Sequence, residues 1–428
     1  MIHSKRILLV DNIITLSLTN LRLREHQEIN TILENDKYRP YVIITYPVLL
    51  SKPLHFLKRK SSFDSRVETY YVPSLAIGSL ASNRMLGRIG KLMFGISNIL
   101  FQSIYLLHLT MLVLLLLLSK RIDLMHAHNP PDLTGIACLL VSKITRVPYV
   151  FEVHDRAPEL YCGEMGLKES SVIFKLMKGI EYLVITNSRG IITVNEHTAA
   201  YFKQFGGPIP VAIYTGTKIN LNKFRKTPFL NKKGKSERII LYQGTLDMAT
   251  IGEPGFYNLE LPLDSMPSIL KNFPDAVLVY VGAGSGRPKL ENRSRLMGLG
   301  DKVIFTGFIS QKEVFNWINR AEIVLIPFGN NPNCHTTVPS KLYEYMAVGK
   351  PIVATRLPGI LEILDHKRNG LLFTVNSITD FTDCVLQLFN DSKLAERLSS
   401  NAQRDFLLKY SQEKNWPKLI SLYDSIIG

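Results

Sequence analysis

The sequence has 428 residues, which is long for one hydrophobic core and comfortable for two domains of about 200 residues each. Lys and Arg number 51 against 36 Asp and Glu, and the formal net charge of +15 implies an anionic partner: nucleic acid, an anionic membrane surface or a phosphorylated substrate. Nucleic acid is the weakest of the three and is not expected, because no zinc-finger spacing, aromatic RNA-binding signature or helix-turn-helix pattern is present.

The cysteines and the N-terminus indicate where the protein works. The four cysteines, Cys138, Cys162, Cys334 and Cys384, are far apart in the sequence and form no metal-ligand pair. We therefore expect reduced thiols, and no metal site. The chain enters a strand directly, without the apolar core of a signal peptide, so a cytoplasmic location is expected.

Apolar strands alternate with helical stretches in both halves of the chain, which predicts an α/β fold of two doubly wound parallel sheets. The expected strands of the first half are residues 7–10, 42–46, 124–127, 149–153 and 190–194. Those of the second half are residues 239–243, 276–281, 303–306, 323–327, 351–355 and 370–374.

These strands predict a domain at 1–205 and a second domain at 238–400. Residues 206–237 lie between them and contain GGPIP, YTGT and the basic run NKKGK, so they are the expected linker. A final helical segment is expected at 401–428. Two such domains bind ligands at the carboxyl ends of their strands, and we expect a cleft with donor on one wall and acceptor on the other.

Residues 99–118 are the most hydrophobic segment, ending in LVLLLLL. Twenty helical residues reach about 30 Å, enough to cross a bilayer. Such a span would put the strands before it and the strands after it on opposite sides of the membrane, and one sheet cannot be divided in that way. We therefore expect a buried or membrane-surface helix. The basic stretch at 52–91 is either a solvated face or a docking site for anionic lipid.

Two polar segments follow strands of the first domain. HAHNPPDLTG contains His128, and FEVHDRAPELY contains His154, Asp155 and Glu159. Side chains at the carboxyl ends of parallel strands are expected to line a site. His128 and Glu159 are candidates for the acceptor side. A histidine in such a place is more often structural than catalytic, so residue type alone leaves the role of His154 open.

Two glycine turns follow strands of the second domain. In LYQGTL, Gly244 would let the backbone approach a diphosphate closely, with Thr245 next to it. The glycines of VGAGSG, just before Arg287, are a weak nucleotide signal and more plausibly form a tight turn after a strand.

The segment AEIVLIPFGNNPNCHTTVPSKLYEYMAVGKPIVATRLPG, residues 321–359, carries the strongest signal. It predicts a strand, a polar loop, a helix starting at Pro339 and a second strand. Ser340, Lys341 and Glu344 are three and four residues apart and share one face near the helix N-terminus. Unpaired N–H groups, a lysine and a carboxylate suit a nucleotide diphosphate that carries a sugar.

PSKLYEYMAVGKP resembles the donor-binding motif of the family 4 retaining glycosyltransferases, especially the cell-surface polysaccharide branch. This resemblance implies the GT-B arrangement of two Rossmann-like domains facing a central cleft. It also implies a last helix that packs back on the first domain. A further resemblance lies in the His-Asp of FEVHDRAPELY, whose histidine in the family contacts the transferred sugar.

The resemblance assigns a role to each matching position. Lys341 and Ser340 would hold the phosphates and Glu344 the ribose. The catalytic set would be His154, Asp155 as its orienting residue, and Glu344. The family's first motif glutamate corresponds to Thr336, so Thr336 and Thr337 would hold the sugar through hydroxyl groups.

The turn after Gly244 departs from the family. Relatives usually carry an arginine directly after that glycine and a lysine soon afterwards, whereas here Thr245 follows and the next basic residue is Lys271. Either Lys341, Arg287 or a basic residue of the other domain neutralises the diphosphate, or the enzyme is weak or inactive.

The sequence thus predicts metal-independent, retaining transfer of a sugar from a nucleotide diphosphate sugar to a hydroxyl of a lipid-linked or saccharide acceptor. No cofactor besides the donor substrate is expected. We do expect peripheral contact with the cytoplasmic face of an anionic membrane. Two alternatives remain: a nucleotide-sugar epimerase on the same fold, and a catalytically silent, membrane-docked subunit of a glycosyltransferase complex.

Overall fold

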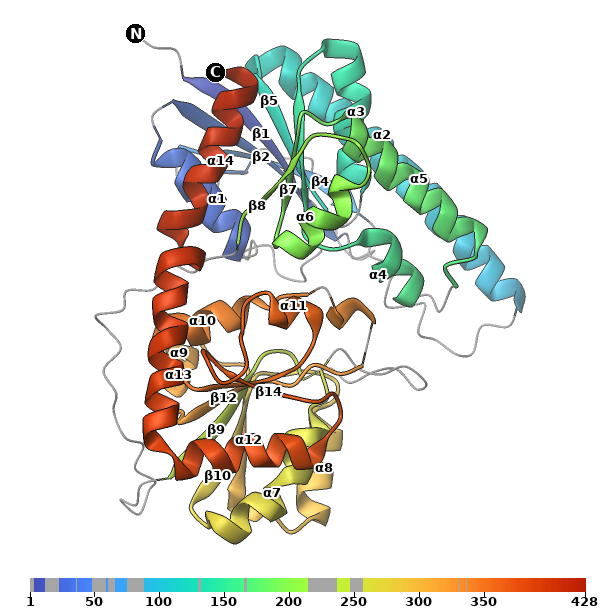
Figure 1. Cartoon of the computed structure of the whole chain (residues 1–428). Coiled ribbons are helices and arrows are strands. Elements are labelled where there is room, and N and C mark those ends of the chain that lie inside the picture. Colours follow the sequence, from blue (N-terminus) through green and yellow to red (C-terminus); the bar gives the residue numbers. More distant parts are fainter. Residues whose placement is uncertain are drawn as a thin grey trace. The chain divides into compact units, whose positions relative to one another are not determined.

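The structure is a computed structural model that describes residues 4–11, 23–35, 37–47, 59–60, 66–74, 88–129, 132–164, 168–214, 237–246, 257–330, 332–335 and 337–428. The chain forms two compact units. Unit 1 comprises Met1–Ile213 and Trp416–Gly428, and unit 2 comprises Tyr214–Asn415. Each unit contains one mainly parallel sheet with helices on its faces, as predicted (Figure 1).

The sheet of unit 1 has the strand order β3-β4-β2-β1-β5-β6-β7-β8, and only the β3–β4 pair is antiparallel among the described strands. Its strands are β1 (Lys5–Asp11), β2 (Tyr38–Pro47), β3 (Arg59–Lys60), β4 (Glu68–Ser74), β5 (Leu124–His128), β6 (Tyr149–Val153), β7 (Gly190–Thr193) and β8 (Pro210–Ala212). Its helices are α1 (Leu23–Leu33), α2 (Arg88–Lys120), α3 (Leu133–Thr145), α4 (Ala157–Glu164), α5 (Val172–Asn187), α6 (Glu196–Lys203) and most of α14 (Gln412–Ile427).

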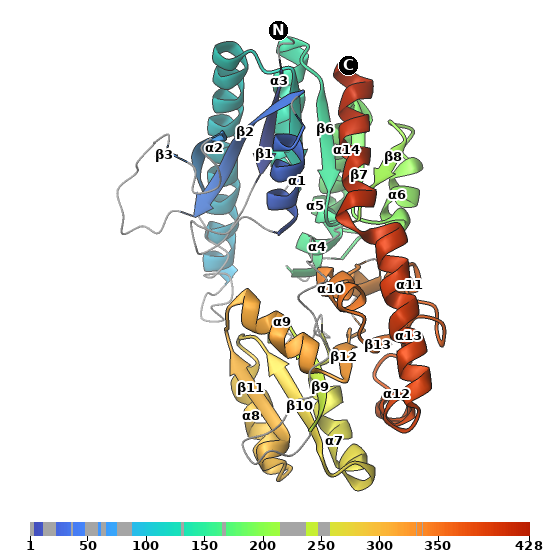
Figure 2. The same ribbon diagram turned by 90° about the vertical axis from the view of Figure 1, so that its left-hand side faces the viewer.

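Side-chain alternation along β1 explains why helices cover both faces of this sheet. Leu8 and Val10 join a core with residues of α2, α3 and α5, whereas Ile7 and Leu9 join a core with α1 and α14. A strand buried on both sides must be apolar at every position, which is why β1 reads as a continuous apolar run. In Figure 2, α1 and α14 lie in front of the sheet and α2 and α3 lie behind it.

The all-parallel sheet of unit 2 has the strand order β11-β10-β9-β12-β13-β14. Its strands are β9 (Arg238–Gln243), β10 (Ala276–Val281), β11 (Val303–Gly307), β12 (Ile323–Ile326), β13 (Ile352–Thr355) and β14 (Leu371–Phe373). Its helices are α7 (Glu260–Asn272), α8 (Arg287–Leu296), α9 (Gln311–Arg320), α10 (Ser340–Val348), α11 (Pro358–Leu361), α12 (Ile378–Asn390) and α13 (Ser392–Asp405), with short turns η2 (Gly300–Lys302) and η3 (Pro332–His335) and a π-helical turn, η4 (Phe406–Tyr410).

The domain limits differ from the predicted ones at two places. Strand β8 lies inside the expected linker, pairs with β7 and belongs to unit 1. It has three residues, too few to produce a recognisable pattern. Residues 401–415 belong to unit 2, where Phe406 and Tyr410 are buried in its core. The chain returns to unit 1 at Trp416, and Trp416, Leu419 and Tyr423 pack in the same core as Ile7.

The hydrophobic segment 99–118 forms the second half of α2. By length and composition alone, Gln102–Lys120 could cross a membrane. However, one side of this helix is buried against the sheet through Tyr105, Leu109 and Val113. Strand β1, before the helix, also pairs directly with β5, after it. A bilayer therefore cannot separate the two ends of α2 without dividing the sheet.

Candidate functional site

Two strands of unit 2 end at the point where the chain reverses its order in the sheet. Strand β9 lies between β10, the next strand in the chain, and β12, which comes two strands after β10. Such a switch point leaves a crevice beyond the carboxyl ends of the strands, the usual ligand site of doubly wound sheets. The turn after β9 and the start of α10, which follows β12, both lie there.

The turn after β9 requires glycine. Gly244 has a φ of 138°, and Gly282, after β10, has a φ of 143°. Gly244 N–H donates to the carbonyl of Val281 at 2.9 Å, and a Cβ added at Gly282 would overlap the carbonyl oxygen of Gly244. The two turns therefore pack backbone against backbone, which leaves no room for a side chain between them.

Helix α10 begins at Ser340, one residue later than predicted. Pro339 is its N-cap, with an extended backbone (φ −74°, ψ 137°). The helix ends at Gly349, whose φ of 69° is the left-handed conformation common at helix ends. Along the helix Lys341 and Glu344 are buried, whereas Ser340 is exposed.

Lys341 reaches from α10 to the turn after β9. Its Nζ lies 4.4 Å from the centroid of the Tyr242 ring and 4.1 Å from that of Tyr257, and it donates to the Tyr242 hydroxyl at 3.3 Å. A Cβ added at Gly244 would collide with this Nζ. The ammonium group therefore lies against the backbone of the glycine turn.

Burial lowers the pKa of Lys341 to about 7, although Glu344 attracts the charge. Lys178 of unit 1 behaves differently. Burial also disfavours its charge, but Glu181 and Glu159 outweigh this effect and raise its pKa. Lys341 faces two aromatic rings and a hydroxyl, which stabilise a cation less than paired carboxylates do. An anionic ligand would supply the missing charge.

Glu344 lies beside this lysine. Its Oε2 accepts a hydrogen bond from Gln243 Nε2 at 2.6 Å, and burial raises its pKa while Gln243 and Lys341 oppose the rise. The hydroxyl of Tyr345, the next residue, accepts a hydrogen bond from the backbone N–H of Gln243 at 3.3 Å. The last residue of β9 is therefore bound to α10 at two points, which fixes the helix start relative to the glycine turn.

The other residues predicted to bind the donor differ in their exposure and in their contacts. Arg287, the first residue of α8, forms an ion pair with Glu291 through Nε at 2.7 Å. Its guanidinium group also lies close to Gly307, since a Cβ added at that glycine would be 3.0 Å from it. Gly307 ends β11 and bridges to Gly282. Thr245 is exposed and its carbonyl accepts from Tyr242, Thr337 is half-buried, and Thr336 lies outside the described residues.

Unit 1 gathers its predicted histidines in the same way. His154 follows β6, and its Nε2 lies 3.2 Å from Glu152 Oε1 and 3.2 Å from Nδ1 of His128, the last residue of β5. The carboxyl ends of these adjacent strands thus bring His128 and His154 together, as their positions predicted. Glu152 and His128 hold the His154 ring. The orienting role of Asp155 stays a prediction.

Asn129 organises the turn that carries His154. Its Oδ1 accepts the backbone N–H groups of His154 at 2.8 Å and Asp155 at 3.4 Å. Its Nδ2 donates to the carbonyl of Asp155 at 2.9 Å and to Asp132 at 3.0 Å. Burial raises the pKa of Asp132 to about 6, against the hydrogen bond from Asn129.

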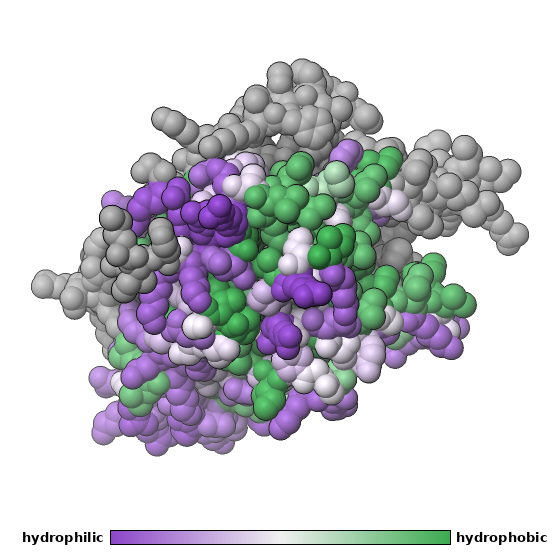
Figure 3. All heavy atoms as spheres, turned by 90° about the horizontal axis from the view of Figure 1, so that it is seen from above, coloured by the Kyte–Doolittle hydropathy of each residue, from purple (hydrophilic) through white to green (hydrophobic). Residues whose placement is uncertain are grey.

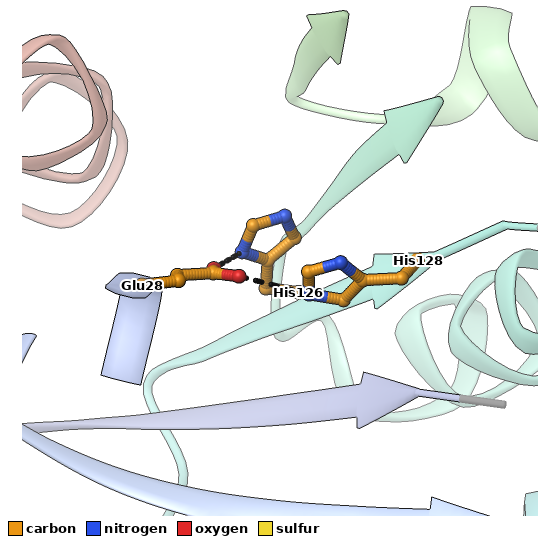
Figure 4. A group of neighbouring side chains, drawn as sticks. All are labelled: Glu28, His126 and His128. Carbon is orange, nitrogen blue, oxygen red and sulfur yellow. Dashed lines mark ion pairs between the residues drawn. The ribbon is translucent and has the colours of Figure 1, made fainter. Parts of the chain in front are cut away.

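Behind His154 lies a buried charged network (Figure 4). Both oxygens of Glu28 face imidazole rings, with 2.6 Å from Oε1 to His126 Nδ1 and 3.3 Å from Oε2 to His128 Nε2. On its other side, His126 Nε2 lies 3.3 Å from Glu152. The Tyr423 hydroxyl of α14 lies 2.6 Å from His126 Nδ1. Burial disfavours the His126 charge, but Glu28 and Glu152 outweigh burial and raise its pKa to about 9.

The same side chains include two groups with metal-binding atoms: Glu28, His126 and His128, and His128, Glu152 and His154. Imidazole and carboxylate ligands suit zinc, whose ligand atoms lie about 3.3 Å from each other in a tetrahedral site. The 2.6 Å distance between Glu28 and His126 is instead that of a charge-assisted hydrogen bond, and the His126 and His128 rings stack at 4.4 Å. The group of Glu28, His126 and His128 therefore fits an ion-pair network, whereas in the second group His154 Nε2 lies 3.2 Å from both Glu152 Oε1 and His128 Nδ1, a spacing that zinc ligands also have.

Glu159, the second candidate for the acceptor side, lies on α4 in an ion-pair cluster. It accepts from Arg156 and lies 3.4 Å from Lys178 Nζ, and the Arg156 guanidinium covers the Tyr201 ring at 4.0 Å. These contacts join α4, α5 and α6, and the acceptor-side role of Glu159 stays a prediction.

Sequence reasoning missed Glu28, Asn129, Gln243 and Tyr257. Glu28 and Tyr257 are far in sequence from the groups they contact, so no spacing links them. Asn129 was within a noted segment, and its place directly after β5 was a usable signal. Gln243 was likewise the residue before the noted glycine.

Comparisons with known proteins point to glycosyltransferases. A family model described as glycosyl transferases group 1 matches residues 231–405, and a model described as a glycosyl transferase 4-like domain matches residues 100–214. An uncharacterized glycosyltransferase of Methanocaldococcus jannaschii is 27% identical over 315 residues, 71% of this chain and 75% of that protein. The phosphatidyl-myo-inositol mannosyltransferase of Propionibacterium freudenreichii is 22% identical over 304 residues, 70% of each chain.

Solved structures identify the fold as GT-B. Anabaena HepE in complex with UDP and glucose superposes with a TM-score of 0.65 at 15% identity, covering 99% of this chain and all of that one. Sucrose-phosphate synthase from Thermosynechococcus elongatus gives a TM-score of 0.64 at 14% identity, covering 99% of both chains. The predicted pair of Rossmann-like domains is confirmed by these neighbours.

The glycine turn can be tested by stability. Gly282→Ala places a methyl group on the Gly244 carbonyl as well as straining φ, and we expect a loss of roughly 3 kcal/mol or more in the free energy of unfolding of unit 2. Gly298→Ala is the control, because its φ of 68° carries the strain while nothing lies within 4 Å, and about 1 kcal/mol is expected. Urea denaturation measures both, and equal losses would contradict the backbone contact.

The buried network predicts a pH-dependent stability. Because the folded pKa of His126 is about 9, above its ordinary value of 6.5, the ion pair stabilises fully below pH 6.5 and is lost as pH rises through 9. We expect its contribution, up to about 3 kcal/mol, to fall across this range in wild type and to be missing in His126→Gln. Urea denaturation at pH 6.5, 8 and 9 tests this, with the exposed His197→Gln as control. Parallel pH profiles for wild type and His126→Gln would contradict it.

Proposed function

We propose that this glycosyltransferase of the GT-B fold is a retaining enzyme of the family 4 type, which moves a sugar from a nucleotide diphosphate sugar to a hydroxyl of a lipid-linked or polysaccharide acceptor. The observation that carries the proposal is the buried Lys341 against the Gly244 turn, with Glu344 beside it at the switch point of the sheet. A lysine poised for an anion, a helix N-terminus and a bare glycine backbone together fit a diphosphate.

Each side chain has a part in this proposal. Lys341, Ser340 and the start of α10 bind the diphosphate, and Glu344 accepts from ribose hydroxyls. Arg287, at the same strand edge, adds positive charge in place of the basic pair that relatives carry after the glycine. Thr336 and Thr337 hold the sugar, and His154 of unit 1 contacts it from the acceptor-binding domain. HepE, whose structure contains UDP and glucose, supports a nucleotide-sugar ligand for this fold.

The proposed reaction breaks the bond between the anomeric carbon and the diphosphate oxygen. The acceptor oxygen forms the new bond on the same face of the sugar, and its proton passes to the departing diphosphate. Negative charge develops on that diphosphate, where Lys341 and the α10 N-terminus stabilise it electrostatically. This chemistry needs no metal ion or further cofactor.

The comparisons favour neither the epimerase nor the silent subunit, because the matched families and relatives are transferases. One relative is named for a phosphatidyl-myo-inositol acceptor, which supports a lipid-linked acceptor here. We accordingly propose that the protein works at the cytoplasmic face of a membrane.

The transfer itself can be tested by acceptor-dependent nucleotide release. A panel of UDP, GDP and ADP sugars would first be screened by thermal shift, and a lipid-linked saccharide extract would supply the acceptor. We expect Glu344→Ala to lower release about 100-fold or more, since a buried ribose contact is lost. The exposed Glu396→Ala on α13 is the matched control and should match wild type. Release that needs no acceptor would contradict transfer, and no shift with any nucleotide sugar would contradict the donor site.

The low pKa of Lys341 predicts pH-dependent donor binding. A bound diphosphate favours the charged lysine, so above pH 7 binding must take up a proton and affinity should fall by up to about tenfold per pH unit. Below pH 7 the affinity should change little. Calorimetry in buffers of different ionisation enthalpy measures both the affinity and the proton uptake.

Two variants separate Lys341 from its neighbours in this test. Lys341→Met should bind the nucleotide diphosphate more weakly and without the slope above pH 7. Arg287→Met should weaken binding at every pH and keep the slope. An unchanged slope in Lys341→Met would show that another group titrates.

A further inference from the structure

One side of α2 exposes a stripe of large apolar side chains. Ile104, Leu107, Met111, Leu115 and Leu118 are each at least 41% exposed. Their spacing of three and four residues places them along one line of the helix, opposite the stripe that is buried against the sheet. Single exposed leucines are common, but a continuous stripe of this length marks an interaction surface.

The neighbouring helices extend this stripe. Helix α3 packs between α2 and α5, and the buried sides of all three share one core against the same face of the sheet. The outer side of α3 exposes Leu140 and Ile144, and that of α5 exposes Val172, Ile173, Leu176 and Leu183. We call the eleven exposed side chains of the three helices the apolar helix face. Figure 3 shows hydrophobic residues gathered in patches on the side of unit 1 where α2, α3 and α5 lie, beside hydrophilic ones.

The charged residues within α2, α3 and α5 are mainly basic, whereas Asp123 and Glu169, just outside these helices, are exposed and acidic. Among the described residues of the three helices the only acidic side chain is Glu181, which is buried and paired with Lys178. Exposed cations border the face: Arg121 follows α2, Lys143 and Arg146 lie at the end of α3, and Lys175 lies on α5. Apolar side chains flanked by lysine and arginine suit an interface of acyl chains and anionic headgroups.

We propose that the apolar helix face docks unit 1 on a bilayer surface containing anionic phospholipid. The helices lie on the membrane and do not cross it, because β1 and β5 pair with each other from opposite ends of α2. The leucines enter the headgroup and acyl boundary while the cations contact lipid phosphates. This surface is distinct from the residues proposed for sugar transfer, so binding to lipid can be measured without turnover.

Flotation of the full chain with vesicles tests the proposal. Vesicles of phosphatidylcholine with about 30% phosphatidylglycerol are compared with phosphatidylcholine alone. We expect wild type to bind the anionic vesicles about tenfold more strongly, and this preference to shrink at high salt. The triple variant Leu107→Glu, Leu115→Glu and Leu176→Glu should lose about tenfold or more of the binding.

Controls keep loss of binding separate from loss of folding. Leu296→Glu on α8 is a matched change at an exposed leucine of unit 2 and should bind like wild type. The pair Lys143→Glu and Lys175→Glu leaves the leucines intact and should remove the preference for anionic vesicles. Circular dichroism and the thermal shift with nucleotide sugar check that each variant is folded. A transferase that fails to float overturns this inference alone, whereas lipid binding without nucleotide binding overturns the proposed function alone.

Three outcomes contradict the docking surface. Wild type that binds no vesicles overturns it, as does a folded triple variant that binds as wild type does. A concentration-dependent dimer that the triple variant abolishes, with no vesicle binding by wild type, would assign the face to a second copy of the chain.

Discussion

The donor edge of unit 2 depends on a buried cation, the Lys341 ammonium group, which lies between two tyrosine rings against a bare glycine backbone. Burying a charge is unfavourable unless opposite charge or hydrogen bonds compensate. Lys178, which is paired with carboxylates, keeps a raised pKa, whereas the pKa of Lys341 falls to about 7. The bare backbone of Gly244 leaves room for the lysine, and Gly282 packs against Gly244. An anion at this edge would compensate the charge of Lys341, and because no basic pair follows Gly244, Lys341 is the residue proposed to neutralise it.

Unit 1 also buries a positively charged side chain, but there carboxylates compensate the charge. His126 is buried between Glu28 and Glu152, so its charge is compensated from within the fold. Because Glu28 comes from α1, Glu152 from β6 and the Tyr423 hydroxyl from α14, one imidazole joins elements from both ends of the chain. His154 shares Glu152 with this network. Its ring position is thus coupled to the packing of the C-terminal helix, and the fully buried His126 supports the nearly buried His154.

Much of this architecture could be predicted because strands buried on both faces leave an unbroken apolar run. All eleven predicted strands are present. Strand β4, in a stretch interpreted only by its charge, and β8, with three residues, gave no such pattern. Lys341, Glu344 and Gly244 were predicted because helix spacing and the strand-end rule place them. Tyr257 and Glu28 were not, since they meet their partners through tertiary packing that no local period encodes. The one-residue shift at Pro339 has a simpler origin: its extended ψ makes it a cap.

The positive surplus of the sequence is distributed in a way that composition cannot reveal. One part lies inside the fold, where Lys341 contacts aromatic rings and Lys350 donates to the carbonyls of Asn319 and Ala321. Another part borders the exposed leucines of α2, α3 and α5, helices whose described residues include one acidic side chain, the buried Glu181. A single average charge would suggest one anionic partner. The placement instead separates the proposed site for a small anion from the surface proposed for anionic lipid. A lipid-linked acceptor would connect the two, because a protein held at a membrane meets that acceptor by diffusion in two dimensions.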